Sequence, residues 1–154
     1  MLFETLKNIR ALLFELTIAP IRQYKQPYHV IDKSIKPVVD LLNRIEGVET
    51  IASCHGHLFS HIEAPYVYFK APVEIATHLH KHIWTTTQFN PIYWAIEGWY
   101  NSECELCFRL SSPTYDSAYH HFFSRLWHFG YQRRELEQSI VQLAQEIKGS
   151  LKTL

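Results

Sequence analysis

The chain has 154 residues, with 15 basic and 15 acidic side chains and 10 histidines, so its formal net charge is zero at neutral pH. This length fits one domain with a substantial core, and a hydrophobic fraction of 47% excludes an intrinsically disordered chain. Zero charge without a block of like charges argues against general nucleic-acid binding, which needs clustered Lys and Arg. No stretch reaches about 18 consecutive apolar residues, so we expect no transmembrane helix and no membrane partner.

The cysteines predict a reducing compartment. Cys54, Cys104 and Cys107 form an odd set without the spacing of a disulfide framework. The first 16 residues carry Glu4 and Glu15 within an apolar pattern, and they lack the basic start and continuous apolar stretch of a secretory signal. We therefore expect a cytoplasmic protein.

The N-terminal third of the chain has the hydrophobic pattern of two helices. Apolar residues recur every three or four positions over residues 2–16, which predicts a helix that packs on a core or forms a homodimer. A second helix should begin near Asp32 or Ser34, both good caps, and end at Gly47.

The pattern of residues in the rest of the chain predicts both strands and helices. Segments enriched in β-branched and aromatic residues are expected to be strands at 48–54, 66–70, 92–99 and 103–110. A helix is expected at 72–86, and a final helix begins at Asp116 or Ser117, breaks near Gly130 and continues over 133–148. Two hairpins separated by a helix predict a single α+β domain over residues 1–154, with a mostly antiparallel sheet of about four strands and helices packed on it.

The most specific stretch for chemistry follows the first predicted strand. Ser53, Cys54, His55, Gly56 and His57 combine a hydroxyl, a thiol and two imidazoles where a strand opens into a loop. We predict Ser53, Cys54, His55 and His57 as catalytic residues, while Gly56 would let a cofactor approach the main chain. The alternative is structural: Cys54 is a small buried residue, Ser53 bonds the local backbone and the histidines are solvated.

This stretch and the helix before it resemble a known family. The resemblance rests on the following residues: Asp32, Ser34, Ile35, Val38, Leu41, Leu42, Thr50, Ile51, Ala52, Ser53, Cys54, His55, Gly56 and His57. It resembles the start of the wybutosine-synthesis methyltransferase family, the third enzymes of that pathway on phenylalanine tRNA, in which a helix leads into a strand ending in Ser-Ser-Cys-Ser-Gly-Arg.

The resemblance implies an α/β scaffold, S-adenosylmethionine as cofactor and a modified guanosine as substrate. Ser53, Cys54 and Gly56 match the motif by position, whereas Ala52, His55 and His57 stand where the family has serine, serine and arginine. A neutral histidine cannot pair with a phosphate or carboxylate in the bidentate way that arginine does.

The spacing of two histidines makes a transition metal another candidate cofactor. His78 and His82 are four apart on a predicted helix and share a face, so both could bind one ion, with Cys54, His55 or His57 completing the site. Solvated helix positions explain the same spacing. Cys104 and Cys107 would point to opposite faces of a strand and are predicted to be structural.

Aromatic residues favour a core but also suit an interface. Trp94 and Trp99 fall on opposite faces of a strand, and with Tyr93 and Tyr100 they could instead stack on a base. A second aromatic group surrounds His120, His121 and His128, which we expect to pack in a core. Arg133, Arg134 and Lys148 alternate with glutamates and are predicted to form a solvated helix face.

Two functions remain open from the sequence. The first is a small ligand-binding or enzymatic domain centred on the loop after Cys54, related to tRNA-modification methyltransferases and binding a small molecule or nucleotide. The alternative is a non-catalytic interaction or inhibitor protein, of the kind that mobile elements encode, with an aromatic surface or the N-terminal helix contacting a protein partner or a second copy.

Overall fold

The fold is a four-stranded antiparallel sheet covered on one face by helices. The computed structural model describes residues 31–56, 64–118 and 130–152, so the predicted helix at 2–16, His57 and the histidines at 120, 121 and 128 lie outside the described residues. The strands are β1 (Glu49–Cys54), β2 (Tyr66–Lys70), β3 (Ala95–Tyr100) and β4 (Leu106–Ser111), and their order in the sheet is β1-β2-β4-β3. The predicted α+β class and its two hairpins are confirmed.

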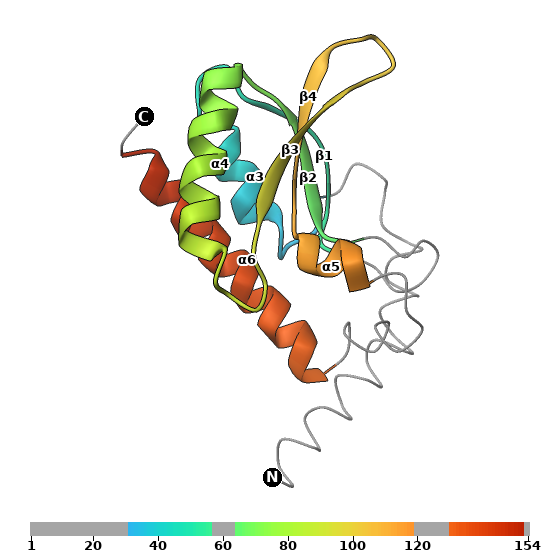
Figure 1. Ribbon diagram of the computed structural model, residues 1–154, viewed down its shortest axis with the longest axis vertical. Coiled ribbons are helices and arrows are strands. Elements are labelled where there is room, and N and C mark those ends of the chain that lie inside the picture. The colour runs from blue at the N-terminus through green and yellow to red at the C-terminus, as the bar shows by residue number, and fades with distance from the viewer. Residues whose placement is uncertain (1–30, 57–63, 119–129, 153–154) are drawn as a thin grey trace, which may run out of the picture.

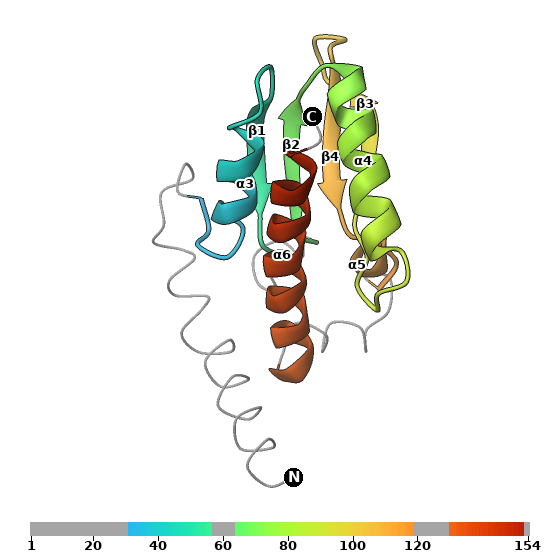
Figure 2. The ribbon, with the colours of Figure 1, turned by 90° about the vertical axis from the view of Figure 1, so that its left-hand side faces the viewer.

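Three helices form a second layer. α3 (Lys36–Leu42), α4 (Val73–Thr87) and α6 (Gly130–Ser150) lie side by side on one face of the sheet (Figures 1 and 2). The short α5 (Pro113–Ala118) follows β4 at the end of the sheet where β1 also ends. None of the helices in the described part of the chain is long and apolar enough to cross a membrane.

The core fills the space between the two layers. Alternate residues of β2 and β4 face the helices: Val67 and Phe69 pair with Leu110 and Phe108. The helices contribute buried side chains at helical spacing: Val38, Leu42, Leu79, Ile83, Leu136, Ile140, Leu143 and Ile147. Each such side chain, fully buried, stabilises the fold by roughly 1.5–3 kcal/mol. The opposite face of the sheet, here called the outer face, carries Cys54, Tyr66, Tyr68, Arg109 and Trp99.

The expected cap of α3 is wrong. The residue before the helix is Ile35, no side chain caps it, and the helix ends at Leu42 rather than at Gly47. Asp32 instead accepts hydrogen bonds at its main-chain oxygen from the N–H groups of Ile35 and Lys36, which leaves its carboxylate for another partner. The last turns before β1 are tighter than an α-helix, because Ile45 bonds back to Leu42 and Val48 to Ile45.

β1 contains an irregularity that the alternating pattern does not reveal. Thr50 pairs with Phe69 while Ala52 pairs with Tyr68, so Ile51 is an extra residue in the ladder. Thr50 consequently faces the helices, where it bonds the Asn43 side chain, and Ala52 and Cys54 face the other way. Thr50 and Cys54 therefore lie on opposite faces of the sheet, although strict alternation along a strand would place them on the same face.

Other boundaries also differ from the expected ones. The third strand begins at Ala95 rather than at residue 92, and the fourth begins at Leu106 because 101–105 form the turn. Asn101 organises that turn, since its side-chain oxygen accepts from the N–H groups of Glu103 and Glu105 and Cys104 takes a φ of 61°. α5 begins at Pro113 instead of at Asp116 or Ser117.

Candidate functional site

Cys54 ends β1 as a buried thiol on the outer face. Its residue is 3% exposed, and it pairs in register with Tyr66. The Cys54 sulfur accepts a hydrogen bond from the N–H of Gly56 at 3.3 Å, and Gly56 has a φ of 89°, which glycine adopts at little cost. The thiol therefore helps to hold the chain reversal that brings the next residue, His55, into the site.

His55 and Asp32 form the most polar contact of this loop. Asp32 Oδ2 lies 2.6 Å from His55 Nδ1, and the two side chains are 16% and 17% exposed. A carboxylate oxygen this close to Nδ1 favours the tautomer that carries the proton on Nδ1 and the lone pair on Nε2.

Arg133, near the start of α6, binds the main chain of the loop that follows β1. Its Nη1 donates to the main-chain oxygens of His55 and Gly56 at 3.4 and 3.3 Å, and Glu137 Oε1 lies 3.4 Å from its Nε. Arg133 is 9% exposed. The prediction that Arg133 belongs to a solvated helix face is wrong, because the side chain is turned inward to the loop carbonyls.

A buried phenol from α5 lies within the electrostatic influence of Arg133. Tyr115 is 1% exposed, and burial raises its pKa to about 12, although the positive charge of Arg133 opposes that rise. The hydroxyl is therefore neutral at physiological pH. We call the set Asp32, Cys54, His55 and Arg133 the strand-end site, whereas Tyr115 belongs to the core.

The structure separates some of the residues predicted to act together. Ser53 pairs with Val67 and faces the helices, whereas Cys54 pairs with Tyr66 on the outer face, so their side chains diverge. His57 lies outside the described residues. Of the predicted catalytic residues, Cys54 and His55 thus remain at the strand-end site, and Gly56 supplies its turn.

The histidines proposed as metal ligands lie elsewhere. His82 Nε2 is 3.3 Å from Glu146 Oε2, at the far end of α6 from Arg133. Glu146 comes thirteen positions after Arg133 in α6, which is about 20 Å along the helix axis. His78 and His82 are therefore not brought to the Cys54 loop, and the described ranges contain no group of three or more His, Cys, Asp or Glu side chains placed to hold a metal ion.

The remaining cysteines do not form a metal site or a disulfide with each other. Cys104 is exposed in the turn between β3 and β4, whereas Cys107 is fully buried in β4, and both are free thiols. The two thiols are thus separated because Cys104 lies in the turn before β4, and not because both point to opposite faces of one strand as predicted.

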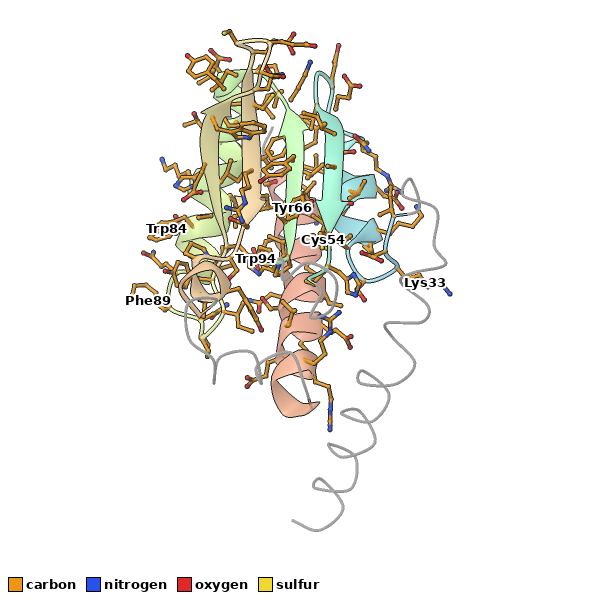
Figure 3. All side chains as sticks on the ribbon, turned by 90° about the vertical axis from the view of Figure 1, so that its right-hand side faces the viewer. Lys33, Cys54, Tyr66, Trp84, Phe89 and Trp94 are labelled. Atoms are coloured by element: carbon orange, nitrogen blue, oxygen red, sulfur yellow. The ribbon has the colours of Figure 1, made fainter. Side chains whose placement is uncertain are left out.

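An aromatic row crosses the outer face from the strand-end site. The ring centroids of Tyr66 and Tyr68 are 4.6 Å apart, and those of Tyr68 and Trp99 are 5.3 Å apart. Tyr66 starts the row beside Cys54 (Figure 3). Trp94 instead packs in the core against α6, so the two tryptophans lie on opposite sides of the sheet as predicted.

The charges on the outer face are largely balanced. Lys70 donates to Glu105, and this hydrogen bond is the main cause of a lowered pKa at Glu105 and a raised pKa at Lys70. Arg109 lies in register between Tyr68 and Glu97. A ligand on this face would therefore meet aromatic rings and paired charges rather than a strongly basic surface.

Two members of the site were not predicted from the sequence: Asp32 as the partner of His55, and Arg133. Asp32 resembled a helix cap, and Arg133 sits in a run of alternating charges. No local pattern marks either contact, because both join segments that are distant in the chain.

Comparison of the chain with known proteins found no family model, no curated protein and no solved structure that matches it.

Proposed function

We propose that this chain is a small ligand-binding or enzymatic domain in which His55, oriented by Asp32, exchanges a proton with a bound ligand. The observation that carries the proposal is the 2.6 Å contact between Asp32 Oδ2 and His55 Nδ1. A carboxylate in this position fixes the tautomer of the imidazole and stabilises the imidazolium formed when Nε2 accepts a proton.

The other residues of the strand-end site support this role. Arg133 holds the main chain of His55 and Gly56, which limits the movement of the imidazole. Cys54 bonds the Gly56 N–H, which favours a positioning role for its thiol.

The ligand we propose is a planar ring, bound where the aromatic row meets Cys54. Tyr66, Tyr68 and Trp99 provide stacking surfaces, and the balanced charges favour a neutral ring over a polyphosphate. The resemblance to the wybutosine-synthesis methyltransferases suggests two probes, guanosine and S-adenosylmethionine. The choice of these two probes rests only on Ser53, Cys54 and Gly56, the residues that match the family motif by position.

The tautomer of His55 tests the central claim. In long-range proton–nitrogen spectra of the ¹⁵N-histidine-labelled protein, at a pH where the ring is neutral, we expect the Nδ1–H form at His55, identified by its loss in His55→Gln. Asp32→Ala should abolish that preference, whereas Asp40→Ala, on the adjacent exposed surface, should not. An Nε2–H form in the unmodified protein would overturn the proposal.

Ligand binding is a separate measurement. Calorimetric titration with guanosine and with S-adenosylmethionine should give binding to at least one, weakened at least tenfold by His55→Gln and unchanged by His78→Ala. Binding that His55→Gln leaves intact would remove His55 from the site.

A second candidate function is protein interaction, favoured by aromatic side chains that are not buried. Phe89 is 91% exposed, Tyr100 70%, Trp99 40% and Trp84 38%. Trp84 and Phe89 lie on the side of the molecule that carries β3 (Figure 3). Exposed aromatic residues are typical of interface hot spots. Sedimentation velocity of the full chain tests this candidate, because a monomer at every concentration contradicts self-association.

A further inference from the structure

β3 is an edge strand with a regular ladder on one side only. Its six residues pair without interruption with β4, from Ala95 with Ser111 to Tyr100 with Leu106. The other edge of the sheet, β1, is broken by the extra residue Ile51, a device that discourages pairing with another chain. The β3 edge has no such interruption.

Side chains of α4 occupy the first part of this edge. The N–H of Trp94 donates to Thr87 Oγ1 and the N–H of Ile96 donates to His80 Nδ1, each at 3.1 Å. Since the N–H of Ile96 points away from β4, alternation directs those of Gly98 and Tyr100 away from β4 as well. Neither of these two N–H groups has a partner among residues 31–56, 64–118 and 130–152.

We propose that a second copy of this chain pairs with β3 in an antiparallel arrangement, with the two-fold axis at Trp99. Gly98 of each copy then lies opposite Tyr100 of the other, and each pair exchanges two main-chain hydrogen bonds. In this register the N–H groups of Gly98 and Tyr100 in both copies, four in all, form main-chain hydrogen bonds. A register centred on Gly98 would instead require the Ile96 N–H, which His80 already occupies.

The side chains at this edge are complementary to themselves. Trp99 faces Trp99 of the second copy at a non-hydrogen-bonded position, where the Cα atoms are about 4.5 Å apart and aromatic pairs are favourable. Tyr100, 70% exposed, lies opposite Gly98, whose lack of a side chain leaves room for the ring. Glu97 lies opposite Asn101 rather than another carboxylate, so no like charges meet.

The result would be a continuous eight-stranded antiparallel sheet, in which the two Trp99 side chains meet on the outer face. The proposal does not depend on proton transfer at His55, because the β3 edge and the strand-end site share no residue, although Trp99 also belongs to the aromatic row. The tautomer of His55 and the association of the chain are measured separately, so failure of one leaves the other standing.

Engineered disulfides test the register. Residue 99 lies opposite the free thiol of Cys107 on β4, so the test uses the full chain carrying Cys104→Ser and Cys107→Ala. In this background we expect Trp99→Cys to form a disulfide-linked dimer under mild oxidation, because the paired Cα separation falls within disulfide range. Glu97→Cys in the same background is the matched control. In this register its sulfur lies about 13 Å from its copy, too far for a disulfide. Equal cross-linking of both variants, or none with Trp99→Cys, would overturn the register.

Sedimentation equilibrium tests the association without a covalent bond. The unmodified chain should form dimers whose fraction rises with concentration, and Trp99→Lys should raise the dissociation constant by roughly tenfold or more, since two like charges replace an aromatic pair. Phe89→Lys removes a more exposed aromatic residue outside β3 and should leave the dimer unchanged. Circular dichroism checks that both variants are folded. A monomeric unmodified chain would overturn the proposal.

Discussion

The indole Nε1–H of Trp94 donates a 2.7 Å hydrogen bond to Ser139 Oγ, which links the chain just before β3 to the middle of α6. Trp94 is 1% exposed, so its indole depends on this partner. Removing one partner of a buried hydrogen bond costs more than the net value of the bond, because the other group remains desolvated.

Ser139→Ala should therefore destabilise the protein by about 1–2 kcal/mol in urea unfolding. In the background of Trp94→Phe, which lacks the donor, the same substitution should cost clearly less. An equal cost in both backgrounds would show that Ser139 acts without Trp94.

Arg133→Met should loosen the loop after β1. The substitution keeps much of the side-chain volume but removes the hydrogen bonds to the oxygens of His55 and Gly56, at an expected cost of about 1–2 kcal/mol. Hydrogen exchange at Gly56 should accelerate more than exchange at Phe69 in the centre of the sheet. Lys148→Met, an exposed position on the same helix, is the control and should change neither quantity.

Tyr115 should make the protein less stable in alkali. Its pKa is raised by burial from its usual 10 to about 12, so the folded state holds the phenol proton more tightly than the unfolded state does. Stability from this difference is complete below pH 10 and is lost as the pH rises towards 12, by no more than about 3 kcal/mol. Tyr115→Phe should flatten this part of the curve of unfolding free energy against pH. An unchanged slope would mean that other groups cause it.

Two glycine substitutions should have opposite effects on thermal stability. Gly47 has a φ of 79°, and a Cβ there would lie 3.3 Å from Pro72 Cγ and Cδ, so Gly47→Ala should destabilise by about 1–2 kcal/mol. Gly149 lies within α6, and its added Cβ would meet His82 Nε2 at an ordinary 3.5 Å. Gly149→Ala should stabilise by about 0.5–1 kcal/mol, because alanine is the better helix former. Calorimetry of both variants measures the contrast.

The fold follows from patterns within single segments, and for that reason most of it was predictable. The strand at 66–70 alternates core and outer-face residues, and α4 repeats its apolar residues with helical spacing. The extra residue at Ile51 was not predictable, because its cause is the pairing of β1 with β2 and not the composition of β1.

The strand-end site was predictable only where its residues are adjacent in sequence. Cys54, His55 and Gly56 stand together, and their residue types attract notice. Asp32 and Arg133 reach His55 from other elements, and the hydrogen bond from Arg133 to His55 spans 78 residues. Such contacts depend on the packing of α3 and α6 against the sheet, which local spacing does not encode.

His80 and His55 are held in opposite protonation patterns. His80 accepts the Ile96 N–H at Nδ1, so its ring proton lies on Nε2, whereas the proton of His55 lies on Nδ1 beside Asp32. The His80 contact joins the middle of α4 to the edge of the sheet, and the His55 contact joins the segment before α3 to the end of β1. Each imidazole thus connects two segments that are distant in the sequence.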